Sequence, residues 1–220
     1  MIDEILPAAA VSVESRGDIE DVVLFPAELA AISRAVEKRR REFTTVRACA
    51  REAFARLGIE PSPILNGARG EPLWPEGVVG SITHCDGYRA VAIAPASALA
   101  TIGIDAEPHE PLPDGVLDLI AGEQERAWLA RLGRSHPQVC WDRLLFSAKE
   151  SIYKAWFPLA HSWLGFEDAH VELDIETATF RATLLVPIPD HVDPSLGVMS
   201  GRWLIRDGLV LSAIAIAASP

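Results

Sequence analysis

Residues 141–157 read WDRLLFSAKESIYKAWF and have the pattern of a helix that is apolar on one side only. The apolar side chains recur at helical spacing and form one stripe, namely Trp141, Leu144, Leu145, Ala148, Ile152, Ala155 and Trp156. The other side is aromatic and charged, with Phe146, Glu150, Tyr153, Lys154 and Phe157, and Lys149 on its shoulder. The pattern predicts that one face packs on a core and the other forms a wall of a site, unless the charged residues form only an i,i+4 surface pair.

The segment TIGIDAE, residues 101–107, predicts a short strand that Pro108 ends. Asp105 and Glu107 are two residues apart, so their side chains leave the strand on the same face. Two adjacent carboxylates need a cation or water, and oxygen-only ligands favour Mg²⁺ over zinc. The alternative is a strand end whose carboxylates are simply solvated.

Two Asp-Gly turns predict one hairpin in each half of the chain, at 79–93 around Asp86-Gly87 and at 203–217 around Asp207-Gly208. The remaining predicted elements are a short strand at 22–25, a helix at 26–57 that stops at Gly58, an ordered loop at 61–80, a helix at 117–132 and strands between 170 and 186. A helix followed by a hairpin in each half suggests a duplicated α+β unit.

Positive charge is concentrated in the first predicted helix, although the chain as a whole carries a net charge of −11. Eight of its 20 Lys and Arg residues are Arg34, Lys38, Arg39, Arg40, Arg41, Arg47, Arg51 and Arg56. If the helix is continuous, its apolar stripe contains Val36, Phe43, Val46, Ala50, Phe54 and Leu57. Arg39 and Arg47 then lie at the edges of this stripe, where a guanidinium needs either a protein carboxylate or a ligand phosphate. One basic island on an acidic protein favours a small phosphorylated ligand over nucleic acid.

Other patterns narrow the class of protein. The first residues lack the features of a secretory signal, and no apolar run is long enough to span a bilayer. Cys49, Cys85 and Cys140 form no CxxC pair, which favours a reducing cytoplasm. No Walker A or dinucleotide-binding glycine motif is present. We therefore expect a cytoplasmic protein that binds neither membrane nor nucleic acid.

Three segments in order, GSITH at 80–84, IGIDAE at 102–107 and FSAKESIYK at 146–154, resemble the signature of Sfp-type 4′-phosphopantetheinyl transferases of the single-chain bacterial branch. The resemblance implies an α+β fold that is a pseudo-dimer of two similar α/β lobes in a monomeric chain. An N-terminal lobe, 1–100, would contact the nucleotide and 3′-phosphate of coenzyme A. A C-terminal lobe, 101–220, would hold the metal site and the helix quoted above.

The same resemblance implies roles for individual residues. Asp105, Glu107 and Glu150 would bind Mg²⁺, or Mn²⁺ in its place, and Glu150, Lys154 and Asp105 would be catalytic. The implied coenzyme A contacts are Arg39, Arg47, Asn66, Gly67, Ala68, Arg69, Thr83, His84, Asp105, Lys149, Glu150, Lys154 and Trp163. The family commonly has a lysine where this chain has Asn66, so one phosphate contact is weakened or moved, for example to Arg69.

The implied reaction is transfer of the 4′-phosphopantetheine arm from coenzyme A to a serine of an apo acyl or peptidyl carrier protein. Fatty-acid, polyketide and nonribosomal-peptide carriers, the last including those of siderophore synthesis, all remain open. The alternatives are a catalytically silent module that binds coenzyme A or carrier proteins, and another Mg²⁺-dependent enzyme that cleaves a pyrophosphate. The acidic trio and Lys154 are all present, which disfavours the silent module.

Overall fold

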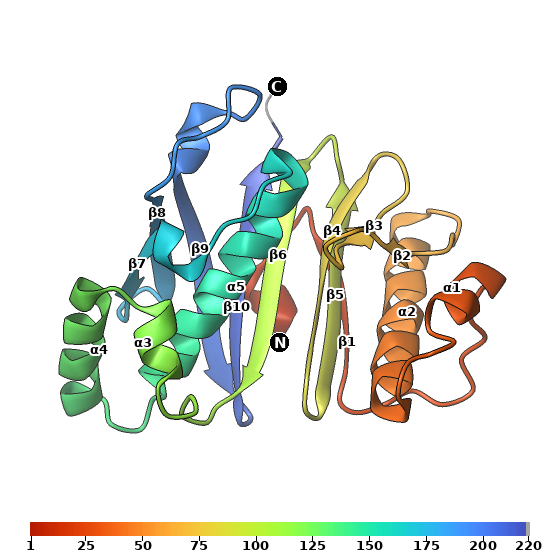
Figure 1. Cartoon of the computed structure of the whole chain (residues 1–220). Helices are drawn as coiled ribbons and strands as arrows, with labels where there is room; N and C mark the ends of the chain where they lie inside the picture. The colour runs from red at the N-terminus through yellow and green to blue at the C-terminus, as the bar shows by residue number, and fades with distance from the viewer. Residues whose placement is uncertain (219–220) are drawn as a thin grey trace.

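The computed structural model describes residues 1–218, in which two antiparallel sheets lie side by side, each with a long helix packed against it (Figure 1). The helices are α1 (Pro26–Ala31), α2 (Glu37–Leu57), α3 (Val116–Ile120), α4 (Glu123–Ser135) and α5 (Trp141–Ala160). The strands are β1 (Val11–Ser15), β2 (Leu65–Asn66), β3 (Pro72–Leu73), β4 (Val78–Cys85), β5 (Tyr88–Pro95), β6 (Leu99–Pro108), β7 (Ala169–Asp174), β8 (Thr179–Leu184), β9 (Val198–Arg206) and β10 (Leu209–Ala217).

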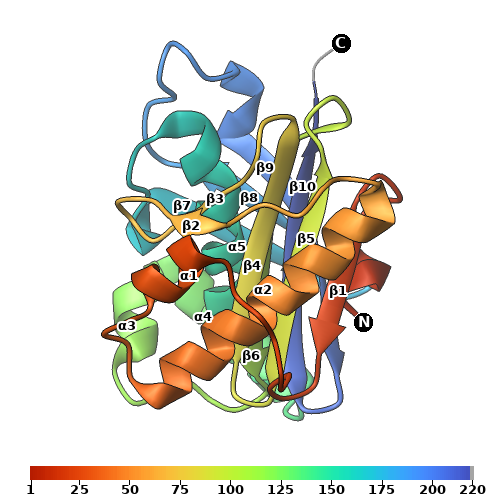
Figure 2. The ribbon, with the colours of Figure 1, turned by 90° about the vertical axis from the view of Figure 1, so that its right-hand side faces the viewer.

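The first sheet has the strand order β1-β5-β4, and the second has the order β6-β10-β9-β8-β7. Helix α2 crosses the first sheet (Figure 2), and α5 packs against β6 and β10 of the second. Both predicted Asp-Gly hairpins are present, as β4-β5 and β9-β10, and Gly87 and Gly208 adopt the positive φ that such turns require. The α+β fold is therefore confirmed. No helix within residues 1–218 is long and apolar enough to cross a membrane.

The two sheets meet where β4 runs beside β6, and side-chain hydroxyls join them there. Ser81 Oγ accepts a hydrogen bond from the Ile104 N–H at 3.1 Å, and Thr83 Oγ1 accepts one from the Ala106 N–H at 2.9 Å. These hydroxyls satisfy backbone donors on the outer edge of β6 that no neighbouring strand pairs. Asp105 lies between the two bonded residues, so the junction places it at the boundary between the sheets.

A close approach of α5 to β6 depends on Gly103. A β-carbon at this position would lie 2.0 Å from the Ser151 carbonyl oxygen and 2.7 Å from the Ala155 nitrogen. Only glycine leaves room for the helix backbone at this separation. Asp105 follows two residues later on the same face of β6, and it therefore faces α5.

The predicted helix at 26–57 is wrong as one element, because α1 and α2 are separated by a turn. Ser33 Oγ donates to the Ala30 carbonyl at 2.8 Å, a local bond that competes with helix continuation. The Arg40 side chain then binds the Ser33 carbonyl, which stabilises the break. Val36, predicted in the apolar stripe, is instead the N-cap of α2 and is 73% exposed. The rest of that stripe is buried or partly buried.

Three further boundaries differ from the prediction. Residues 22–25 form no strand, whereas β1 pairs with β5 at a place where no strand was predicted. The helix expected at 117–132 is divided into α3 and α4. Gly122 is the N-cap of α4, and its N–H donates to the carboxylate of Glu125 in the first turn of that helix. Helix α5 extends to Ala160, three residues beyond the predicted end, with Pro158 in its last turn. All seven residues of the predicted α5 stripe are buried.

Candidate functional site

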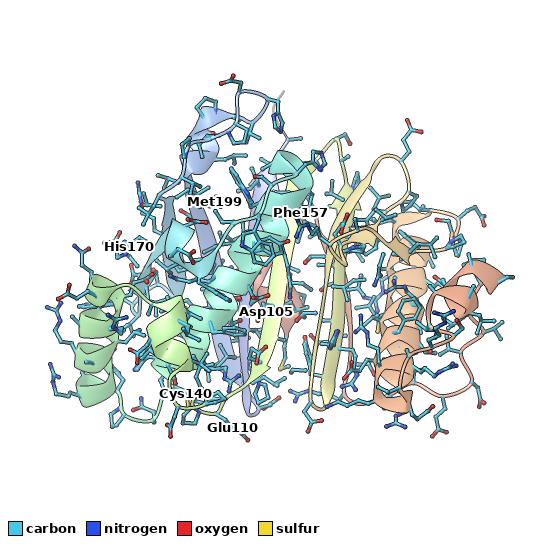
Figure 3. All side chains as sticks on the ribbon, in the orientation of Figure 1. Asp105, Glu110, Cys140, Phe157, His170 and Met199 are labelled. Atoms are coloured by element: carbon cyan, nitrogen blue, oxygen red, sulfur yellow. The ribbon has the colours of Figure 1, made fainter. Side chains whose placement is uncertain are left out.

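A cavity of about 770 Å³ opens between the two sheets. Its walls come from α2, from segment 66–74, from β4 and β6, and from α5. The predicted aromatic and charged side of α5 lines the cavity with all five of its residues, namely Phe146, Glu150, Tyr153, Lys154 and Phe157. Asp105 on β6 and Phe157 on α5 lie in the central part of the molecule (Figure 3). A volume of this size is typical of a small-molecule site.

Asp105 is 4% exposed and lines the cavity. Its Oδ1 accepts a hydrogen bond from Lys154 Nζ at 2.7 Å and a long one from Thr83 Oγ1 at 3.4 Å. Lys154 Nζ also donates to the Ile104 carbonyl at 3.1 Å. Asp105 Oδ2 is buried and has no hydrogen-bond partner in the structure. A buried carboxylate oxygen without a partner is costly, so this atom is suited to a ligand that carries positive charge.

Glu107 and Glu150 add two more carboxylates to the same wall. Burial and the neighbouring Asp105 raise the pKa of Glu107 to about 7, even though Arg143 Nη1 donates to its Oε2 at 2.9 Å. Burial, and then Asp105, also raise the pKa of Glu150. Burial, and after it the charge of Asp105, thus disfavours the ionised forms of both glutamates, and a bound cation would offset this cost. The donor set, oxygen only, fits Mg²⁺.

The carboxylates do not yet form a closed metal cage. Within residues 1–218, no three or more His, Cys, Asp or Glu side chains are close enough together to hold a metal ion as they stand. Asp105 is paired with Lys154, and Glu107 is paired with Arg143. Asp105 Oδ1 and Glu107 Oε2 are thus engaged by side-chain cations, whereas Asp105 Oδ2 has no partner.

Arg39 and His84 face the carboxylates from the other side of the cavity. Arg39 Nη1 donates to His84 Nε2 at 2.7 Å, and Glu42 Oε2 lies 3.5 Å from His84 Nδ1. Burial lowers the pKa of His84, and Glu42 offsets this only in part. The lowered pKa favours the neutral imidazole, whose Nε2 accepts from Arg39.

Arg47 is a second guanidinium of this wall and is only 3% exposed. It stacks on the Phe43 ring at 3.8 Å and donates to the Ile64 carbonyl and to Asn66 Oδ1, both at 3.0 Å. Burial lowers its pKa to about 10, so it stays charged at pH 7. Protein carboxylates lie near both arginines, since Glu42 Oε2 is 3.7 Å from Arg39 Nη1 and Glu28 Oε1 is 3.9 Å from Arg47 Nε, and both guanidinium groups also line the cavity.

One wall of the cavity is thus acidic and the other basic, an arrangement that fits a ligand with a metal-bound phosphate at one end and further phosphate at the other. Residues 27–94 match the model of the 4'-phosphopantetheinyl transferase N-terminal domain, and residues 101–193 match that of the 4'-phosphopantetheinyl transferase superfamily. The chain belongs to the 4'-phosphopantetheinyl transferase superfamily.

Similar proteins align with this transferase over almost its full length. It is 52% identical over 221 residues to 4'-phosphopantetheinyl transferase Svp of Streptomyces mobaraensis, covering 99% of this chain and 90% of that protein. It is 50% identical to Npt of Nocardia iowensis, covering 99% and 100% of the two chains. It is 45% identical to PptT of Mycobacterium tuberculosis, covering 98% of each. The chain is accordingly an enzyme that transfers phosphopantetheine from coenzyme A to carrier proteins, and neither alternative is supported.

The structure corrects the expectation that Lys149 of this transferase faces the phosphates. Its side chain is 2% exposed, and its Nζ donates to Glu125 Oε2, to the Ile120 carbonyl and to the Phe166 carbonyl at 2.8–2.9 Å. Three acceptors satisfy all three ammonium donors, so none is left for a ligand. The shoulder of α5 on which Lys149 lies points towards α4 and not into the cavity.

The other expected contacts of the transferase are distributed unevenly. Thr83 and Arg69 line the cavity, as does Asn66, whereas Gly67 and Ala68 do not. Trp163 is 64% exposed and lies outside the cavity lining. Its ring packs at a tilt of 55° against Tyr153, which does line the cavity, with 5.0 Å between the ring centroids. Trp163 thus extends the aromatic wall of α5 outwards.

Sequence reasoning missed two residues that shape the acidic wall. Arg143 binds Glu107 and also donates to the Glu110 and Pro111 carbonyls at 3.0 Å. It precedes Glu150 by seven residues, and this two-turn spacing puts both on the same helix face, which could have identified it. Ser81 precedes Thr83 by two residues on β4, and the same-face rule for strands could have indicated its contact with β6.

Proposed function

We propose that this transferase binds coenzyme A in the cavity between the two sheets and Mg²⁺, or Mn²⁺ in its place, at Asp105, Glu107 and Glu150. The observation that carries the proposal is the buried, unpartnered Asp105 Oδ2 beside two carboxylates whose pKa values are raised. A divalent cation there would take up the missing positive charge and bring the three oxygen donors into one coordination sphere.

Arg39, Arg47 and His84 are proposed to hold the 3′-phosphate and its surroundings at the opposite wall. In support, both guanidinium groups line the cavity, and each is braced by protein contacts that leave further N–H donors for a ligand. Asn66, Arg69 and Thr83, which line the cavity, would flank the nucleotide. Residues 1–100 would then supply the nucleotide contacts, and residues 101–220 the metal site and catalytic side chains.

The reaction proposed for this site is attack by the carrier serine oxygen on the β-phosphate of coenzyme A. Glu150 would accept the serine proton, directly or through a water molecule, which its raised pKa favours. Lys154, held at the floor by Asp105, would stabilise charge on the transferring phosphoryl oxygens. The bound cation would supply further charge neutralisation on the pyrophosphate. The P–O bond to the 5′-nucleotide breaks, and 3′,5′-adenosine bisphosphate leaves.

Trp163 is proposed to contact the pantetheine arm, because it prolongs the aromatic wall of Tyr153 beyond the cavity. We further propose that the enzyme acts in the cytoplasm as a monomer on apo acyl and peptidyl carrier proteins. The three cysteines are free within residues 1–218, which fits a reducing compartment. The net charge of −11 makes long-range attraction to nucleic acid or to an anionic membrane unfavourable.

The test is to incubate the enzyme with coenzyme A, Mg²⁺ and a panel of apo carrier proteins and to record intact carrier mass. We expect a gain of one phosphopantetheine arm that EDTA abolishes and that a carrier serine-to-alanine variant does not show. Asp105→Ala should lose the activity while its unfolding midpoint stays close to that of the parent. Unchanged turnover by Asp105→Ala would contradict the metal assignment.

A further inference from the structure

Arg47 is held in one position by contacts on several sides. Phe43 covers one face of the guanidinium, and the Ile64 carbonyl accepts from Nε. The remaining hydrogen bond is from Nη2 to Asn66 Oδ1 at 3.0 Å. These two bonds use two of the five N–H donors of an arginine. Of these two bonds, the one to Asn66 lies on the cavity wall, because Asn66 and Arg47 both line the cavity while Ile64 does not.

The acceptor itself is fixed by the backbone around it. Asn66 ends β2 and pairs with Pro72 of β3, and the next residue continues this pairing, because the Gly67 N–H donates to the Glu71 carbonyl at 2.8 Å. A short hairpin therefore presents Oδ1 at a set place on the cavity wall. The backbone of Asn66 is thus held in place, and its exposed side chain is held by the bond to Arg47.

The charge around Arg47 explains why a neutral acceptor is useful here. Arg39 and Arg51 both lie close enough to disfavour its positive charge, and only Glu28 opposes them. Glu28 is itself shared with Arg51, whose Nη2 lies 2.6 Å from its Oε2. A lysine at position 66 would remove the acceptor and add another cation beside this group.

We propose that Asn66 is a positioning residue: its amide oxygen sets the guanidinium of Arg47 for a phosphate of coenzyme A, and Asn66 is not a weakened substitute for a phosphate-binding lysine. The inference rests on the proposed coenzyme A site. It predicts that a lysine at position 66 lowers the affinity for coenzyme A, whereas the other role would predict a higher affinity. If Asn66 itself bound a phosphate, a lysine in its place would strengthen coenzyme A binding. If Asn66 is instead the acceptor for Arg47, a lysine would remove that acceptor and weaken binding.

Isothermal titration with 3′,5′-adenosine bisphosphate, without metal or carrier, separates the two readings. We expect Asn66→Lys and Asn66→Leu to weaken binding about tenfold, the scale of one hydrogen bond to a charged group. Ala68→Lys is the matched control, because Ala68 is exposed on the same loop and outside the cavity lining, so it adds the same charge without touching Arg47. Tighter binding by Asn66→Lys than by Ala68→Lys would overturn the proposal.

A double-mutant cycle with Arg47→Gln tests whether Asn66 acts through Arg47. We expect Asn66→Leu to weaken binding in the parent and to have almost no effect in the Arg47→Gln background, since the group that it positions is then absent. Equal effects in both backgrounds would show a direct ligand contact and overturn the proposal. The kcat at saturating coenzyme A should stay within about twofold while KM rises, because the lost contact is remote from the reacting phosphate. If the parent itself does not bind the nucleotide, the proposed site fails, and the inference fails with it.

Discussion

Replacing Lys149 by methionine tests the correction to its predicted role most directly. The variant keeps an unbranched side chain one atom shorter than lysine and removes the ammonium, so the Glu125 carboxylate and the Ile120 and Phe166 carbonyls each lose a donor. Glu125 still accepts from the Gly122 and Val171 backbone N–H groups. This residual support places the loss at the lower end of the range for a broken buried ion pair, about 3 kcal/mol, or roughly 10 °C in the unfolding midpoint.

Urea unfolding followed by circular dichroism measures that loss, and titration with 3′,5′-adenosine bisphosphate measures ligand affinity on the same samples. Lys149→Met should be less stable and bind the nucleotide as the parent does. A variant of parental stability that binds the nucleotide weakly would refute the reasoning and restore Lys149 to the cavity.

Three other predictions concern packing, acid stability and the outer wall. Gly103→Ala should lower the free energy of unfolding by roughly 3 kcal/mol in urea titration, because its new methyl group would overlap a backbone carbonyl of α5; a stable variant would show that the helix can shift freely. Burial would raise the pKa of Glu14, but hydrogen bonds from the Ile2 N–H and the Tyr88 hydroxyl lower it overall. Its stabilisation is therefore present above its unfolded pKa and lost as pH falls through the folded value, so Glu14→Gln should show a shallower acid-side loss of unfolding midpoint, and an unchanged acid profile would count against this role. Trp163→Ala should raise KM for coenzyme A without changing affinity for 3′,5′-adenosine bisphosphate, and weaker binding of the bisphosphate would move this residue to the nucleotide.

Periodic patterns in the sequence predicted the elements that position the site. The stripe of α5 and the two Asp-Gly hairpins each depend on residues within a few positions of one another, and local spacing records them well. The face of α5 that carries Glu150 followed from the same spacing. The family resemblance then assigned individual roles that periodicity could not.

Contacts between distant residues account for what the sequence did not predict. Lys149 is on the edge of the polar face of α5, and its partners Glu125 and Phe166 are 24 and 17 residues away, so its burial depends on how α4 and the segment after α5 fold back. The break between α1 and α2 depends on Arg40 reaching back to a carbonyl seven residues earlier. Periodicity shows which face is apolar, but it does not show which polar groups become enclosed with a partner.

The hydroxyl contacts between β4 and β6 link the position of Asp105 to the separation of the two sheets. Two side-chain bonds flank it, where a continuous sheet would have a full ladder, and a buried cluster of side chains from β5, β6 and β10 also spans the junction, so any separation of the sheets must open part of this core. Any such separation moves the Ile104 and Ala106 amides away from their hydroxyl acceptors and exposes their protons to exchange with solvent. The rate at which those two amide protons exchange therefore measures how often the cleft widens, and Asp105 between them moves with every opening.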